Sequence, residues 1–136
     1  DVIPLLADLK AAGILTGIIT HGLTDKQAEK LVRLGVVPHL DSEAIFISDE
    51  IGISKPNPKL YETALQRLGL KAAEVMYVGD SPAHDIAPPK SLGMITAWAR
   101  RASRWTPQSE SEQATHEIDD FDQLRTILRE QYTVNL

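Results

Sequence analysis

The strongest constraint on the fold is a repeated alternation between short apolar runs and segments with helical periodicity. The apolar runs cover residues 14–20, 44–48, 75–79 and 94–99. Runs of this length are typical of strands buried in a parallel sheet. Apolar residues recur at helical spacing over residues 1–12, 24–34, 57–69 and about 86–92, and a polar loop at 101–114 precedes a short strand and helix within 116–131. Strands alternating with helices predict an α/β fold, a Rossmann-like parallel sheet with flanking helices.

Composition limits the class of protein. The chain has 136 residues, a net charge of −5 and no cysteine, which predicts one domain without disulfides. It contains no basic stripe, so we expect no nucleic-acid partner. It also contains no apolar run near the ~20 residues of a membrane span, so we expect no membrane partner. A cytoplasmic protein is the default prediction.

Three polar residues follow three of the predicted strands. Thr20 ends the first strand, Lys55 lies in the loop after the second, and Asp80 directly follows the carboxyl end of the third. Because the carboxyl ends of parallel strands share one edge of the sheet, where ligands bind in such folds, we expect these residues to converge there.

Their chemistry fits phosphoryl transfer. Thr20 and the backbone N–H groups around Gly22 are donors for phosphoryl oxygens, and Lys55 supplies positive charge. Asp80 is a candidate Mg²⁺ ligand, because Mg²⁺ prefers oxygen ligands and needs few protein carboxylates. Asp85, five positions later, either orients a metal-bound water or holds Lys55 in place.

Each of these residues, taken alone, also fits a structural role. A threonine at a strand end is commonly a turn residue, and an aspartate such as Asp85 is a common helix cap. Lys55 and His21 taken singly are typical surface residues. The order and spacing of the set, not any one member, favour a site.

Three segments carry a resemblance to a known family. "GIITHG" (17–22), "ISDEIGISKPNPKLYETALQRLG" (47–69) and "VMYVGDSPAHDI" (75–86) resemble motifs II, III and IV of the haloacid dehalogenase-like (HAD) hydrolases. The resemblance covers most of the chain, residues 1–136 being expected to form part of the HAD-like core domain.

The resemblance implies roles for individual residues. Thr20 would bind the transferring phosphoryl group, with His21 and Gly22 beside it, and Lys55 would stabilise its charge. Asp80 would be a Mg²⁺ ligand and Asp85 an additional or indirect ligand. The "VGDS" segment implies a Mg²⁺-dependent phosphatase acting on a small phosphorylated metabolite, most similar to the nucleotidase and sugar-phosphate phosphatase branch.

The family's first motif, D-x-D-x-[TV], does not occur in these residues. Asp120 and Asp122 have the right spacing but lie in the final predicted helix. The resemblance therefore implies that the nucleophilic aspartate, the first strand and the cap lie upstream, and that this chain alone is inactive. That strand would separate the strands ending at Thr20 and Asp80. Without it we expect marginal stability, self-association or pairing with the missing N-terminal segment.

Two departures and two alternatives remain. His21 replaces the family's usual asparagine, so the phosphate contact is expected to rest on backbone N–H groups. Pro88 and Pro89 replace a Gly-Ala-like pair but are tolerable in a first helical turn. The alternatives are a non-catalytic HAD-like remnant or binding module, and a 2-haloacid dehalogenase-like hydrolase.

Overall fold

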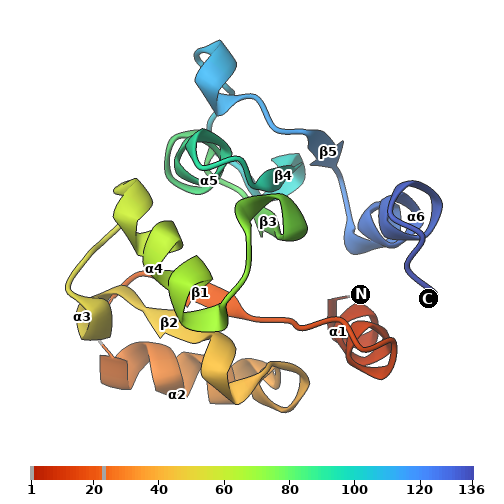
Figure 1. Cartoon of the computed structure of the whole chain (residues 1–136), viewed down its shortest axis with the longest axis horizontal. Helices are drawn as coiled ribbons and strands as arrows, with labels where there is room; N and C mark the ends of the chain where they lie inside the picture. The colour runs from red at the N-terminus through yellow and green to blue at the C-terminus, as the bar shows by residue number, and fades with distance from the viewer. Residues whose placement is uncertain (1, 23) are drawn as a thin grey trace. The chain divides into compact units, whose positions relative to one another are not determined.

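The predicted alternation is present in the computed structural model, which describes residues 2–22 and 24–136 (Figure 1). The strands are β1 (Ile18–Thr20), β2 (Ile45–Ile47), β3 (Met76–Gly79), β4 (Ile95–Ala99) and β5 (His116–Ile118). The α-helices are α1 (Val2–Ala11), α2 (Thr24–Leu34), α3 (Ser48–Ile51), α4 (Pro58–Leu68), α5 (Ala87–Ser91) and α6 (Phe121–Gln131). Single 3-10 turns cover Val37–His39, Ser42–Ala44, Ala72–Glu74, Arg100–Ala102 and Glu110–Glu112, and a π-helix covers Pro82–Ile86. The α/β fold class is confirmed.

All strand pairs are parallel. β1 pairs with β2, with Thr20 opposite Ile47. A separate sheet has the order β3-β4-β5, with Gly79 opposite Trp98. β1 and β3 are therefore each an edge strand of their own sheet.

The chain divides into two compact units. Unit 1 comprises Asp1–Gly52 and Asp120–Leu136, and unit 2 comprises Ile53–Asp119. Within unit 1, the first and last helices are joined by an ion pair of 2.7 Å between Arg125 Nη1 and Asp8 Oδ2. The buried apolar residues of unit 1 include Leu5, Leu9, Leu31, Phe46, Ile47 and Leu124, and those of unit 2 include Leu60, Tyr61, Ile86, Ala97, Trp98 and Ile118. That the 136 residues form part of one domain stays a prediction.

The helix over 57–69 is confirmed together with both of its ends. The side chain of Asn57 accepts a hydrogen bond from the Lys59 N–H, and Gly69 ends the helix in the left-handed conformation at φ 66°. These are the favoured start and stop of a helix. Pro88 and Pro89 lie in the first turn of α5, where prolines are tolerable, and both are buried.

The strand predicted over 14–20 is shorter in the structure. Its first pairing is Ile18 with Ile45, because the residues before Ile45 form a 3-10 turn. Thr16 instead binds the loop that precedes this turn: its carbonyl accepts from the Asp41 N–H at 2.8 Å, and its hydroxyl donates to the His39 carbonyl at 2.7 Å. Without a partner strand, Ile14 and Leu15 remain 41% and 46% exposed.

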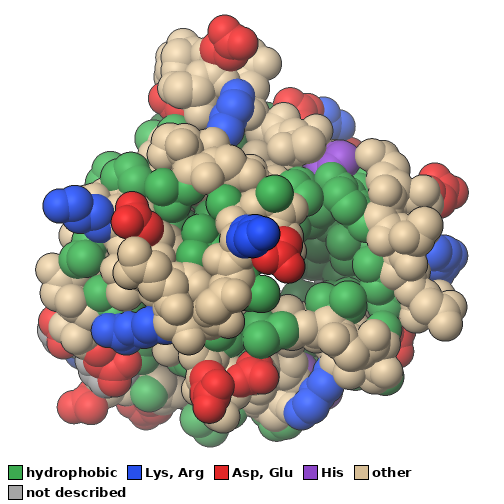
Figure 2. Space-filling model, in the orientation of Figure 1, with side chains coloured by type: hydrophobic (Ala, Val, Ile, Leu, Met, Phe, Trp, Pro, Cys, Tyr) green, Lys and Arg blue, Asp and Glu red, His purple; other side chains and the backbone are tan. Residues whose placement is uncertain are grey.

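The surface agrees with the mixed charge of the sequence. On the face shown in Figure 2, acidic and basic side chains are interspersed. In the part of the chain that the structure describes, no helix is long and apolar enough to cross a membrane.

Candidate active site

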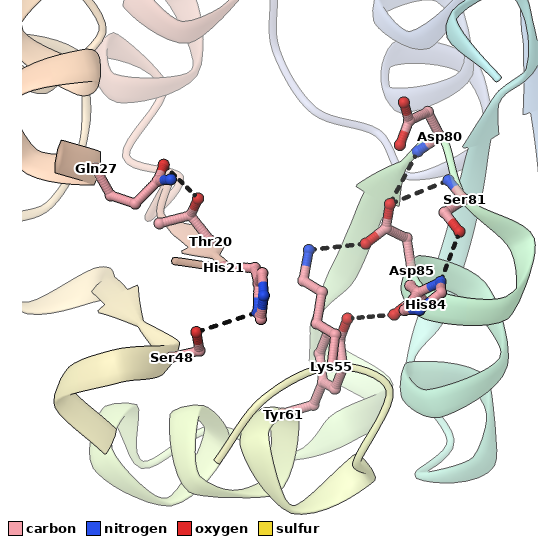
Figure 3. Close-up of polar contacts among 10 residues, drawn as sticks. All are labelled: Thr20, His21, Gln27, Ser48, Lys55, Tyr61, Asp80, Ser81, His84 and Asp85. Carbon is pink, nitrogen blue, oxygen red and sulfur yellow. Dashed lines mark hydrogen bonds and ion pairs between the residues drawn. The ribbon is translucent and has the colours of Figure 1, made fainter. Parts of the chain in front are cut away.

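A lysine and two aspartates meet in unit 2 (Figure 3). Lys55 lies between α3 and α4, Asp80 directly follows β3, and Asp85 lies in the π-helix Pro82–Ile86. Lys55 Nζ is 2.8 Å from Asp85 Oδ1, and the two side chains are only 16% and 9% exposed. Three residues that the sequence predicts to act together are thus neighbours.

Asp85 uses both carboxylate oxygens within the protein. Oδ1 accepts from Lys55 Nζ, while Oδ2 accepts from the Asp80 N–H at 3.2 Å and the Ser81 N–H at 3.1 Å. Burial by itself would raise the pKa of Asp85, but the Lys55 charge and these hydrogen bonds outweigh burial and lower it. The contact favours the second of the two roles considered for Asp85, which is to hold Lys55 in place.

Gly79 makes room for the Asp85 side chain. A Cβ atom at position 79 would lie 2.6 Å from Asp85 Cγ, closer than side-chain atoms approach one another. The glycine that ends β3 is therefore required by packing. It allows the chain to turn back so that Asp85 reaches the N–H groups at the end of the strand.

Asp80 is placed differently from Asp85. It is exposed, and its backbone carbonyl accepts from Trp98 Nε1 at 2.9 Å. Partial burial, followed by the neighbouring Asp85 carboxylate, raises its pKa. Among the residues described, no group of three or more histidine or acidic side chains is placed to hold a metal. Asp80 fits Mg²⁺ as one carboxylate ligand among waters and substrate oxygens, a common mode for this ion.

Two tyrosines support the lysine. Lys55 Nζ lies 5.6 Å from the centroid of the Tyr77 ring, within the range of a cation–π attraction. Tyr61 meets Tyr77 edge to face at a centroid distance of 5.0 Å, and its hydroxyl donates to the His84 carbonyl at 2.7 Å. Burial raises the pKa of Tyr77 and keeps it neutral. Neither tyrosine is predicted as a site residue from the sequence, because Tyr61 lies in the predicted helix 57–69 and Tyr77 in the predicted strand 75–79.

A second group of predicted residues lies in unit 1, after β1. The Thr20 hydroxyl donates to Gln27 Oε1 at 3.1 Å. The Gly22 N–H donates to Ser48 Oγ at 3.2 Å, and Ser48 Oγ lies 3.3 Å from His21 Nδ1. The Gly22 N–H, expected to face phosphate, is thus engaged by Ser48, a residue that the sequence analysis did not single out. That these residues meet Lys55 and Asp80 at one site stays a prediction.

Comparison with known proteins places this chain in a family. The profile of the family described as "Haloacid dehalogenase-like hydrolase" matches residues 1–99. Glyceraldehyde 3-phosphate phosphatase of Methanocaldococcus jannaschii is 40% identical over 127 residues, which are 93% of this chain and 54% of that protein. (S)-2-haloacid dehalogenase 1 of a Pseudomonas species is 30% identical over 128 residues, or 94% of this chain and 55% of that protein.

Solved structures agree with the sequence relatives. A HAD phosphatase from Thermococcus onnurineus superposes with a TM-score of 0.82 at 33% identity, covering 94% of this chain and 56% of that one. The chain thus spans about half the length of the curated relatives it matches. The resemblance read from the three sequence motifs is confirmed, and the chain belongs to the haloacid dehalogenase-like hydrolase family.

Proposed function

We propose that this chain is part of a Mg²⁺-dependent phosphomonoester hydrolase that acts on a small phosphorylated metabolite. The observation that carries the proposal is the ion pair of Lys55 with Asp85 beside the exposed Asp80, in a family that includes phosphatases. A phosphate monoester is small, anionic and oxygen-rich. A positioned ammonium group and an exposed carboxylate suited to Mg²⁺ fit the charge of the phosphoryl group that this reaction transfers.

The residues of unit 2 divide the work. Lys55 would attract the phosphoryl oxygens and stabilise the charge that develops on them. Asp85 and the Tyr77 ring would keep the ammonium group in one position, so that little reorganisation is needed during reaction. Asp80 would hold Mg²⁺, which when bound would neutralise part of the phosphoryl charge.

The residues of unit 1 would bind the same phosphoryl group. The Thr20 hydroxyl would turn from Gln27 Oε1, to which it donates in this structure, to a phosphoryl oxygen. His21 and Gly22 would line the turn beside it. The nucleophile would be an aspartate of a D-x-D-x-[TV] segment, forming an aspartyl phosphate that water then hydrolyses. Because that segment does not occur in these 136 residues, we propose that another part of the protein supplies it and that this chain alone is inactive.

The first test is hydrolysis of para-nitrophenyl phosphate by the 136-residue chain and by the complete protein, each with Mg²⁺ and with EDTA. We expect no turnover by the chain and Mg²⁺-dependent turnover by the complete protein. Asp80→Ala should remove most of that turnover, whereas Asp25→Ala, which removes an exposed carboxylate elsewhere, should leave it unchanged. Mg²⁺-dependent turnover by the 136-residue chain would refute an external nucleophile, and an inactive complete protein would favour a non-catalytic remnant.

A dehalogenase is the second candidate, because one relative carries that name at 30% identity. The same assay separates the two when a 2-haloacid is added as substrate. Release of halide that EDTA does not diminish would favour the dehalogenase. We expect none, because Asp80 offers an exposed carboxylate that chemistry without a metal does not need.

A further inference from the structure

Three groups in unit 1 form a short hydrogen-bonded chain at the end of β1, and Figure 3 shows its Ser48–His21 contact. The Gly22 N–H lies 3.2 Å from Ser48 Oγ, and Ser48 Oγ lies 3.3 Å from His21 Nδ1. Ser48 is the first residue of α3 and is only 5% exposed, whereas His21 is exposed. A buried hydroxyl therefore connects a backbone amide to an accessible imidazole.

The direction of each hydrogen bond follows from what each group is able to donate. A backbone N–H only donates, so Ser48 Oγ is the acceptor for Gly22. Its own proton then needs an acceptor, because a buried hydroxyl proton without one costs about as much as a lost hydrogen bond. Among the residues described, the acceptor recorded for this proton is His21 Nδ1.

We infer that Ser48 holds His21 as the tautomer protonated at Nε2, and that this Nε2–H is a donor for an anionic oxygen at the carboxyl end of β1. A neutral imidazole carries one proton, so a nitrogen that accepts from Ser48 leaves the other nitrogen as a donor. The inference deepens the proposed function and rests on it for the identity of the anion, a phosphoryl oxygen.

The His21 Nε2–H would provide a hydrogen-bond donor that the turn after β1 otherwise lacks at Gly22. The Gly22 N–H is committed to Ser48, so a phosphoryl group at this edge needs another donor. The Nε2–H of the adjacent exposed His21 supplies one. A contrast lies in unit 2, where Ser81 Oγ is 3.1 Å from His84 Nδ1. For that pair no donor to Ser81 Oγ is recorded in the described part of the chain, so the direction of the bond is not fixed.

The tautomer is measurable on the 136-residue chain without any activity. Long-range ¹H–¹⁵N correlation spectra of the imidazoles are recorded at a pH of about 8.5, where model imidazoles are neutral. The spectrum of His21→Gln assigns the His21 signals. We expect Nδ1 to appear unprotonated and Nε2 protonated. A His21 that carries its proton on Nδ1 overturns the inference.

A variant series isolates the part played by Ser48. Ser48→Ala should move the Nδ1 resonance toward that of free histidine and allow a mixture of tautomers. Ser48→Thr, which keeps a hydroxyl, should retain the wild-type spectrum, and so should Ser42→Ala, which removes an exposed serine of the same unit. A His21 spectrum that is the same in Ser48→Ala and wild type overturns the role of Ser48, while the wild-type spectrum tests the tautomer even if that variant fails to fold.

Titration with inorganic phosphate tests the donor role. We expect phosphate to shift the His21 Nε2–H resonance, and Ser48→Ala to weaken that binding by about fivefold, the loss typical of one hydrogen bond. Absence of a phosphate-dependent shift at Nε2 overturns the donor role. If the complete protein hydrolyses no phosphate ester, the proposed function fails, but the tautomer and the anion contact are still decided by these spectra.

Discussion

Replacing Asp85 by alanine removes three interactions from unit 2 at once. The carboxylate pairs with Lys55 Nζ at 2.8 Å and accepts from the Asp80 and Ser81 N–H groups at 3.2 Å and 3.1 Å. With the carboxylate gone, the ammonium group of Lys55, whose side chain is only 16% exposed, loses its ion-pair partner. The two N–H groups at the end of β3 lose their acceptor as well.

The two variants Asp85→Asn and Asp85→Ala separate these losses. Asparagine keeps an oxygen for the two N–H groups and removes only the charge, so we expect a loss of about 1–2 kcal/mol in the free energy of unfolding. Alanine also leaves the N–H groups without an acceptor, and we expect about 3 kcal/mol, at the lower end of the range for a broken buried pair because Lys55 still reaches water.

Tryptophan fluorescence during urea unfolding measures the stability of unit 2, which contains Asp85. Both tryptophans of the chain, Trp98 and Trp105, lie in unit 2, so the signal reports on the unit that contains Asp85. Asp25→Asn is the matched control, since it removes an exposed carboxylate of unit 1 and should change the midpoint little. A loss below about 0.5 kcal/mol in Asp85→Ala would refute the reasoning, because surface substitutions alone reach that size.

Three further predictions concern the same region. Because the Lys55 charge and the hydrogen bonds to Asp85 hold its folded-state pKa below the ordinary value of an aspartate, its contribution to stability should be complete at neutral pH and lost as pH falls below about 4. Acid unfolding of Asp85→Asn should accordingly show a shallower dependence on pH. Gly79→Ala should destabilise unit 2 by about 1–3 kcal/mol in urea unfolding, because its Cβ would lie 2.6 Å from Asp85 Cγ; wild-type stability would contradict the close approach. Tyr61→Phe should cost about 1 kcal/mol in the same assay, since the hydroxyl that donates to the His84 carbonyl is lost, and an unchanged midpoint would show that this bond adds nothing.

The sequence was most informative where local chemistry decides the structure. The helix Pro58–Leu68 starts after Asn57 and ends at Gly69, and both residues act through their own side chain or backbone conformation. The predicted strand over 14–20 is longer than the strand in the structure, Ile18–Thr20, because a strand also needs a partner strand. Its neighbour in the sheet begins only at Ile45. The local pattern of residues 14–17 does not predict where that partner strand begins.

The same distinction applies to the site. Lys55 and Asp85 are predictable because each lies in a loop that follows the carboxyl end of a strand, the edge of a parallel sheet at which ligands bind. Ser48 is not, because it ends the apolar run 44–48 and looks like a strand residue. Its contact with His21 joins residues 27 positions apart, and only the pairing of β1 with β2 brings them together.

The spacing of the two aspartates now has a physical explanation. The chain after β3 turns through a π-helix, so the side chain five positions beyond Asp80 folds back over Gly79 and binds the N–H groups of residues 80 and 81. Asp85 thereby closes the turn and holds Lys55, while Asp80 remains exposed. The two aspartate side chains thus have different environments. Both carboxylate oxygens of Asp85 accept hydrogen bonds from protein donors, whereas Asp80 is exposed. In the proposed function, Asp80 would supply a carboxylate oxygen to the metal. Asp85 would hold the ammonium group of Lys55 in place beside it.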